Sequence, residues 1–205
     1  MLKDTGERVI PNQMNITNEL LLEHLARYHF SIPYVQGRVL DFATGTGYGA
    51  HVIAKKCKNK LTEIVGIDID PEVIKYARGN YYHPLSNYLI ENVTNSNLSE
   101  KLGQFDVILS FETIEHVKDE QQFLANAYQL LKEDGILILS TPFGKGRGKP
   151  CGSPFHVHQL TPDEFYNLFS NYSNTQFYYQ KGPLIEPVET SQQNYYPLGL
   201  VVAKK

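Results

Sequence analysis

Three glycines at alternate positions follow an apolar run early in the chain. Gly45, Gly47 and Gly49 come directly after the segment 39–42 and precede a helix-like stretch. Glycine has no side chain, so the backbone can approach a ligand closely here and can adopt turns that other residues avoid. A loop of this kind between a strand and a helix lies at the end of a sheet where nucleotides bind. The loop predicts a nucleotide-type site, with a simple tight turn as the alternative.

An acidic residue at the end of the next apolar run strengthens this prediction. Asp68 closes the run 65–68, where its carboxylate can accept hydrogen bonds from both hydroxyls of a ribose. Its alternative role is to cap the following helix, but Asp70, directly before Pro71, suits that position better. A dinucleotide site prefers the spacing G-x-G-x-x-G, whereas Gly49 arrives one residue early. The pattern favours a ribose-containing ligand and disfavours an NAD-linked oxidoreductase.

Short apolar runs alternate with amphipathic segments, which is typical of strand–helix units around a parallel sheet. Segments 50–57 and 123–131 have apolar residues at helical spacing. Leu21, Leu25 and Tyr28 indicate a further amphipathic helix near the N-terminus. We expect an α/β fold with strands at 38–42, 63–68, 88–91, 105–110 and 135–140, and two late strands at 175–180 and 198–203 that can pair antiparallel.

The composition is that of an ordinary globular protein. Of the 205 residues, 41% are hydrophobic and 20% are charged, and the length suits one domain better than two. The formal net charge of −3 disfavours nucleic-acid binding, which usually needs a basic excess. Two cysteines are too few for a secreted disulfide scaffold, and no apolar stretch is long enough to span a membrane. We therefore expect a single cytoplasmic domain, 1–205, that binds neither nucleic acid nor membrane.

Four motifs together resemble class I S-adenosylmethionine-dependent methyltransferases. In the family's order they are LDFATGTGYG from Leu40, GIDIDPEVIKYAR from Gly66, FDVILSFETIEHV from Phe105 and LKEDGILILSTPF from Leu131. The resemblance implies a Rossmann-like, seven-stranded sheet of order 3-2-1-4-5-7-6, with strand 7 antiparallel and helices on both faces. It also implies S-adenosylmethionine as the cofactor and S-adenosylhomocysteine as the product.

The domain would then divide into three parts. An N-terminal cap helix would occupy 1–36, the cofactor-binding core 37–143, and an acceptor-side loop, helix and final strands 144–205. The late part is rich in aromatic residues, which either shape the acceptor pocket or pack; they include Tyr179, Tyr195 and Tyr196.

The resemblance also assigns contacts to the cofactor. Asp41 would reach the methionine ammonium directly or through water, Asp68 would hold the ribose, and Ile69 would pack on the adenine. The methionine portion would lie over the loop residues Ala43, Thr44, Gly45, Thr46 and Gly47.

The remaining assignments depart from the family or lie at the edge of its motifs. The family often has an Asp after the third strand to accept the adenine amino group, but this chain has Asn92 there. Its carbonyl can still accept that bond, together with the Val93 backbone. Ser110 ends the fourth strand beside the cofactor. Tyr28 and Arg27 would cap the pocket, with Arg27 pairing either with the methionine carboxylate or with the nearby Glu23.

Catalysis by such an enzyme needs positioning and, for a hydroxyl acceptor, removal of a proton. Methyl transfer from a sulfonium is an in-line displacement, so positioning supplies much of the rate. A base with a pKa near 7 beside the hydroxyl would assist. The candidates are Glu112 and His116 after the fourth strand and His156 in the late loop, each with packing or local hydrogen bonding as its alternative role.

Two other site types are disfavoured. A divalent ion could be held by the acidic and histidine side chains of these segments, which are Glu112, Glu115, His116, His156 and His158. The Asp-rich cluster of metal-dependent catechol-type enzymes is missing, however, and we predict no metal. The dipeptide Pro150-Cys151 resembles the nucleophile motif of cytosine-C5 methyltransferases, but it follows the fifth strand instead of the fourth.

Three further segments are similar to a bacterial subgroup of these methyltransferases associated with glycan and sugar modification. They are TGERVIP (5–11), EHLARY (23–28) and SPFHVHQLTPDEF (153–165). We therefore expect O-methylation of a sugar, nucleotide-sugar or glycan precursor with a histidine base, by a monomer or a homodimer. The alternatives are methylation of a phenol, quinone or natural product, and a cofactor-binding protein without catalysis.

Overall fold

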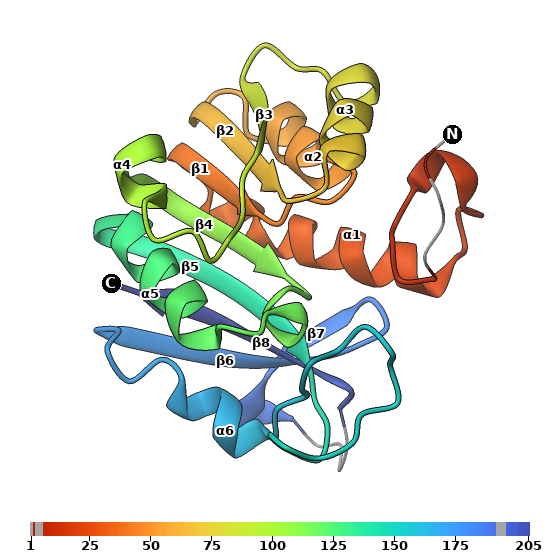
Figure 1. Cartoon of the computed structure of the whole chain (residues 1–205), viewed down its shortest axis with the longest axis vertical. Coiled ribbons are helices and arrows are strands. Elements are labelled where there is room, and N and C mark those ends of the chain that lie inside the picture. Colours follow the sequence, from red (N-terminus) through yellow and green to blue (C-terminus); the bar gives the residue numbers. More distant parts are fainter. Residues whose placement is uncertain (1, 3–5, 192–195) are drawn as a thin grey trace.

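The computed structural model describes residues 2, 6–191 and 196–205, and one twisted sheet runs through them (Figure 1). Its strands stand in the order β3-β2-β1-β4-β5-β8-β6-β7. Their bounds are β1 Gly37–Phe42, β2 Leu61–Asp68, β3 Ser86–Ile90, β4 Phe105–Phe111, β5 Leu131–Pro142, β6 Asn174–Lys181, β7 Leu184–Pro187 and β8 Leu198–Lys204.

The predicted class and strand order are confirmed, with one strand more than expected. Strands β1 to β5 are parallel, and β8 is antiparallel to both β5 and β6. The additional strand β7 forms a hairpin with β6 at the edge of the sheet. Gly182 in the connecting turn has a φ of 58°, a backbone conformation that glycine adopts without strain.

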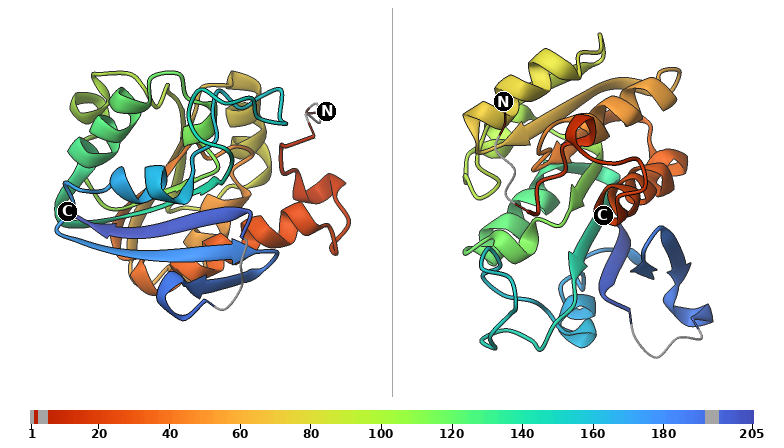
Figure 2. Two further views of the ribbon diagram at one scale, coloured as in Figure 1. Left: turned by 90° about the horizontal axis from the view of Figure 1, so that it is seen from below. Right: turned by 90° about the vertical axis from the view of Figure 1, so that its right-hand side faces the viewer.

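Two layers of helices cover the sheet (Figure 2). Helices α1 (Glu19–Ser31), α2 (Tyr48–Lys56) and α3 (Pro71–Asn80) pack on one face; α4 (Leu98–Leu102), α5 (Glu120–Leu130) and α6 (Pro162–Asn167) pack on the other. As expected, Asp70 caps α3 by accepting a hydrogen bond from the Glu72 N–H. None of the helices in the described part of the chain is long and apolar enough to cross a bilayer.

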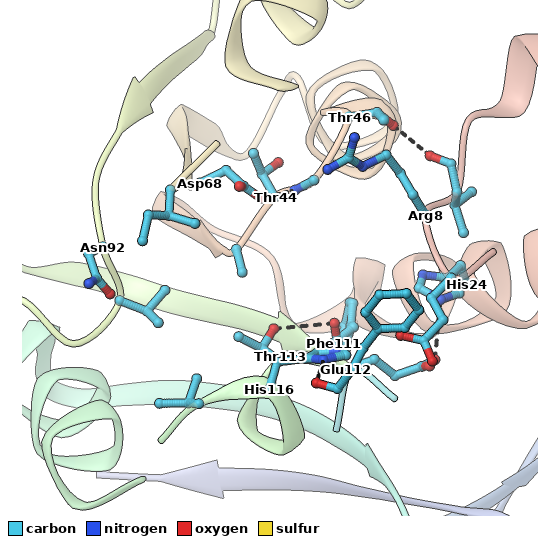
Figure 3. Close-up of a pocket in the computed structure, with 18 of the residues that line it drawn as sticks. Arg8, His24, Thr44, Thr46, Asp68, Asn92, Phe111, Glu112, Thr113 and His116 are labelled. Carbon is cyan, nitrogen blue, oxygen red and sulfur yellow. Dashed lines mark hydrogen bonds and ion pairs between the residues drawn. The ribbon is translucent and has the colours of Figure 1, made fainter. Parts of the chain in front are cut away.

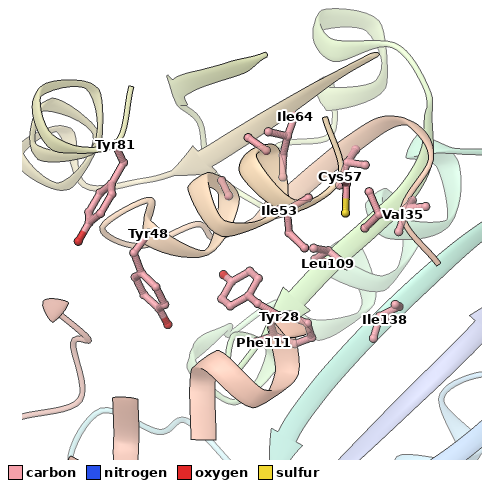
Figure 4. Packing of buried hydrophobic residues seen from close by; sticks show 14 of the residues in the cluster. Tyr28, Val35, Tyr48, Ile53, Cys57, Ile64, Tyr81, Leu109, Phe111 and Ile138 are labelled. Atoms are coloured by element: carbon pink, nitrogen blue, oxygen red, sulfur yellow. The ribbon is translucent and has the colours of Figure 1, made fainter. Parts of the chain in front are cut away.

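Alternate residues of the central strands serve the two hydrophobic clusters. In β1, Val39 belongs to the cluster under α1 and α2, whereas Leu40 belongs to the cluster under α5. Because successive side chains of a strand point to opposite faces, burial on both faces explains the continuous apolar runs. Figure 4 shows the first cluster, in which Tyr28 of α1 lies against Tyr48 and Phe111. The N-terminal helix is therefore part of the core.

Candidate active site

A cavity of about 720 Å³ opens where β1, β2, β3 and β4 end (Figure 3). This volume falls within the range of roughly 300–1,000 Å³ that is usual for small-molecule sites. Its walls come from the loop after β1, the end of β2, the loop after β3, the end of β4 and the N-terminal segment. In Figure 3, Asp68 and Thr44 stand across an open space from Glu112 and His116.

The glycines of the first loop have three separate tasks. A Cβ on Gly45 would meet no atom within 4 Å, and the residue lines the cavity with its backbone. Gly47 has a φ of 85° and precedes α2, where a Cβ would lie 2.7 Å from Ala77. At Gly49 a Cβ would lie 1.8 Å from Cζ of Tyr28. The missing side chain at Gly49 thus lets the N-terminal helix pack against the loop. Of the three glycines, only Gly45 lines the cavity.

The carboxylate of Asp68 is held by two backbone hydrogen bonds and can accept further ones. Oδ2 accepts from the Gly45 N–H at 3.0 Å, and Oδ1 accepts from the Asp70 N–H at 3.0 Å. A carboxylate has about four lone-pair sites, so two donors leave room for two more hydrogen bonds. Asp68 lines the cavity, and Ile69 beside it exposes 65% of its surface there. A large apolar side chain exposed next to a half-satisfied carboxylate is a surface for a planar base and a ribose.

Asp41 lies behind the loop instead of on the cavity surface. Thr44 Oγ1 donates to it at 2.5 Å and the Tyr28 hydroxyl at 3.1 Å. Burial raises the pKa of Asp41 to about 6, although these two hydrogen bonds oppose the shift. The carboxylate therefore ties the N-terminal helix to the glycine loop.

A buried charge cluster stands at the end of β4. Glu112, with a φ of 50°, pairs with the Arg27 guanidinium, and its Oε1 lies 3.2 Å from Nε2 of His24. Arg27 is fully buried and also donates to Oε1 of Gln180 at 2.9 Å. Burial alone would raise the pKa of Glu112, but Arg27 and His24 outweigh it and hold the pKa well below the usual range. Arg27 and His24 thus stabilise the ionised form of Glu112, which weakens it as a proton acceptor, and its role as the base stays a prediction.

The pKa of Glu115, on the same turn, is shifted in the opposite direction from that of Glu112. It is fully buried; its Oε2 accepts from Thr141 Oγ1 at 3.0 Å, and its Oε1 has no hydrogen-bond partner among the described residues. Burial and the charge of Glu112 raise the pKa of Glu115 well above its ordinary value. Burial therefore favours the protonated form of Glu115.

His116 and His156 meet at the rim of the cavity. Their ring centroids lie 4.9 Å apart in an edge-to-face arrangement. His116 lines the cavity and is exposed, while Nε2 of His156 lies 3.6 Å from Oε1 of Glu7. Burial and the nearby His116 lower the pKa of His156, against the opposing effect of Glu7. His158 lies apart from this pair, with its Nε2 3.1 Å from Glu120.

Comparison with known proteins identifies the family. A family model described as a methyltransferase domain matches residues 35–198. The chain belongs to the S-adenosylmethionine-dependent methyltransferases. A probable S-adenosylmethionine-dependent methyltransferase of Mycobacterium tuberculosis is 31% identical over 169 residues, covering 80% of this chain and 58% of that relative. The chain thus spans little more than half the length of the mycobacterial protein.

Other similar proteins have a range of described substrates. A ubiquinone biosynthesis O-methyltransferase of Cereibacter sphaeroides is 27% identical over 75% of this chain and 66% of its own length. Among solved structures, an S-adenosylmethionine-dependent methyltransferase of Archaeoglobus fulgidus has a TM-score of 0.65 at 16% identity, covering 92% of this chain and 95% of that one. The small RNA methyltransferase HEN1 has a TM-score of 0.72 at 16% identity, covering 94% of this chain and 27% of that one. These structures share the fold.

S-adenosylmethionine is accordingly the cofactor of this methyltransferase domain, and the cavity fits it. The spare lone pairs of Asp68, the exposed Ile69 and the open backbone of Gly45 suit a ribose, an adenine and an amino-acid tail. The predicted cofactor residues that line the cavity are Tyr28, Ala43, Thr44, Gly45, Thr46, Asp68, Ile69, Asn92 and Val93. Asp41, Gly47, Ser110 and Arg27 lie behind its walls.

Two predicted cofactor contacts differ in detail from the expectation. Both lone pairs of Asn92 Oδ1 are engaged, by the Thr94 N–H and the Thr94 hydroxyl at 2.9 Å each, so the side chain has its amide N–H groups left to offer. Arg27 pairs with Glu112 and Gln180, and its pairing with the methionine carboxylate stays a prediction. Ser110 Oγ donates to the Phe42 carbonyl at 3.3 Å.

The sequence analysis missed the side chains that the N-terminal segment brings to the methyltransferase site. Glu7, Arg8 and His24 all line the cavity. Arg8 pairs with Asp70 at 2.9 Å, and the Val9 carbonyl accepts from Thr46 at 2.8 Å. The segment 5–11 carried a family signal, although Thr5 lies outside the described residues, as does Tyr195.

Proposed function

We propose that the protein methylates a hydroxyl group of a sugar, a nucleotide-sugar or a glycan precursor. S-adenosylmethionine supplies an already activated methyl group. Asp68 and Ile69 would fix the nucleoside half at one end of the cavity, which leaves the reactive end toward Glu112 and His116. Holding the two reactants in line can supply several kcal/mol of the barrier reduction, about 7–11 in the best cases.

The observation that carries the proposal is the polar character of the acceptor end. Glu7, His24, Glu112 and His116 are the cavity-lining residues that we place there, with Phe155 as an aromatic wall. Several charged and hydrogen-bonding side chains around one ring suit an acceptor with many hydroxyls better than a flat apolar one. The similarity of segments 5–11 and 153–165 to sugar-associated enzymes points the same way, and both segments meet in the structure, where Ser153 donates to Glu7 at 2.6 Å.

The acceptor hydroxyl has to lose its proton as the methyl group arrives. Glu112 is tied to Arg27, and burial raises the pKa of Glu115, so we assign the proton transfer to neither carboxyl group. His116 and His156 are the side chains that we assign to hydroxyl activation, because they stand together at the rim. A positioned group of this kind contributes roughly 10²–10⁴-fold to rate.

The test is a turnover assay with methyl-labelled cofactor against a panel of deoxysugar nucleotides, phenols and quinones. Transfer to the sugars, with a loss of at least about a hundredfold in His116→Asn, is the expected result. His158→Gln serves as the control from the same loop, since His158 pairs with Glu120 away from the cavity. Turnover confined to phenols or quinones would refute the sugar acceptor, and cofactor binding without turnover on any acceptor would refute the enzyme.

A further inference from the structure

Glu7, His116 and His156 gather one potential metal-ligand atom each at the rim of the cavity. These three atoms all lie within 4.8 Å of one another. The best-defined pair, Nε2 of His156 and Oε1 of Glu7, is 3.6 Å apart. Two ligands at about 2.1 Å from a tetrahedral ion are about 3.4 Å apart, so this pair already has the required separation.

Each of the three side chains is held by a hydrogen bond from its outer side. Nδ1 of His116 lies 3.1 Å from the Phe155 carbonyl, which can accept its N–H. At His156 the Gln159 amide N–H donates to Nδ1 at 3.1 Å, so binding an ion through Nε2 requires this amide to turn its oxygen toward Nδ1. The Ser153 hydroxyl donates to Glu7 at 2.6 Å. Ligating imidazoles and carboxylates are typically oriented by such partners, which also set the ring tautomer. A donated Nδ1–H at His116 leaves the Nε2 lone pair for an ion.

We propose that Glu7, His116 and His156 form a binding site for a divalent ion of the manganese-to-zinc series. Two imidazole nitrogens with one carboxylate oxygen suit these ions, whereas Mg²⁺ and Ca²⁺ prefer oxygen ligands. The site draws its ligands from the N-terminal segment, the turn after β4 and the loop before α6, so metal binding would lock these three segments together. This replaces the expectation that the protein has no metal.

The open positions of such an ion face the cavity. Glu7 and His116 both line it, beside Phe155. Three protein ligands leave room for one or two further oxygens, the arrangement found in catalytic rather than structural metal sites. An ion lowers the pKa of a bound oxygen ligand by several units. If the function proposed above holds, the ion would take a hydroxyl, or two neighbouring hydroxyls, of the acceptor, and the histidines would activate it through the ion.

The experiment is titration calorimetry of the protein, freed of metal by a chelator, with Zn²⁺, Co²⁺, Mn²⁺ and Mg²⁺ in the absence of any acceptor. We expect one ion per chain, weaker binding of Mg²⁺, and a visible Co²⁺ spectrum with nitrogen ligands. Glu7→Gln keeps the hydrogen bond from Ser153 but removes the charge, and should weaken binding at least about tenfold. Ser153→Ala should weaken it by roughly 10–100-fold through the orientation of Glu7.

His158→Gln is the matched control, because it removes a histidine of the same loop that pairs with Glu120 instead. Its ion affinity should equal that of the unmodified protein, with folding checked by circular dichroism. An absence of binding, or binding that survives Glu7→Gln and His116→Asn alike, would overturn the proposal. Since no acceptor is present, failure of the sugar hypothesis would leave these results unchanged.

Discussion

The contact between Gly49 and Tyr28 allows a sharp prediction about how the N-terminal helix supports the site. In Gly49→Ala the new methyl group would lie 1.8 Å from Cζ and 2.2 Å from Cε2 of Tyr28. Ordinary contacts need about 3.5–4.0 Å, so the ring must move by more than 1 Å. It is buried against Tyr48 and Phe111, with ring centroids 5.6 and 5.0 Å away, and cannot turn aside freely.

The magnitude follows from two contributions. Overpacking a filled core costs typically about 1–3 kcal/mol. Moving Tyr28 also removes a hydrogen-bond donor from the buried Asp41 carboxylate, for which about 1–3 kcal/mol is usual. Because the two effects overlap, we expect the free energy of unfolding to fall by about 3 kcal/mol. For a chain of this size that lowers Tm by roughly 6–12 °C.

The assay is urea unfolding followed by circular dichroism and tyrosine fluorescence, which suits a protein with 14 Tyr and no Trp. Gly79→Ala is the control: Gly79 lies in α3, and its new Cβ would meet no atom within 4 Å. Replacing a helical glycine without strain should stabilise the protein by up to about 1 kcal/mol. Equal stability of Gly49→Ala and the unmodified protein would refute the docking of α1 on the glycine loop.

Three other predictions concern single carboxyl groups. Asp68→Asn should weaken S-adenosylhomocysteine binding by about 10–100-fold in calorimetry, because charge-assisted hydrogen bonds contribute about 1.5–3 kcal/mol; unchanged affinity would remove Asp68 from the ribose site. Glu112→Gln strips the buried Arg27 of its counter-ion and should cost about 3–5 kcal/mol of unfolding free energy, whereas Glu115→Gln replaces a carboxyl group whose pKa is raised by burial and should cost less than about 1 kcal/mol; equal costs would contradict the opposite pKa shifts of the two groups. In the protein without cofactor, the pKa of Asp41 is raised by burial from 3.8 to about 6, so the folded state binds a proton more tightly than the unfolded state. The contribution of Asp41 to stability should therefore fall by about 2 kcal/mol as the pH rises from 4 to 7, measured as the changing difference from Asp41→Asn; a constant difference would contradict the shift.

Local patterns predicted most of the fold. The strand positions rest on apolar runs and the cap at Asp70 rests on one dipeptide, so neighbours in sequence carry that information, whereas the strand order was implied by the family resemblance. The hairpin strand β7 was missed because only four residues form it at the sheet edge. Gly182, in the turn between β6 and β7, was the residue that could have indicated a hairpin.

The site was predicted where a motif is contiguous and missed where segments meet from far apart. Gly45 and Asp68 each stand in a short contiguous motif, and both line the cavity. Arg27 donates a hydrogen bond to Gln180, 153 residues away, and Ser153 donates one to Glu7, 146 residues away. No local spacing in the sequence predicts contacts over such separations. The ion pair between Arg27 and Glu112 likewise joins residues 85 positions apart.

The central claim is that one cavity holds the cofactor with its reactive end at His116 and His156. A crystal structure with S-adenosylhomocysteine would test this claim most directly. We predict both ribose hydroxyls on Asp68, the adenine against Ile69, and the sulfur facing the space between Glu112 and His116. A second cavity, lined by Tyr179 and Tyr196 among others, lies behind the loop before α6. A ribose away from Asp68, or a sulfur that faces this second cavity, would contradict the account.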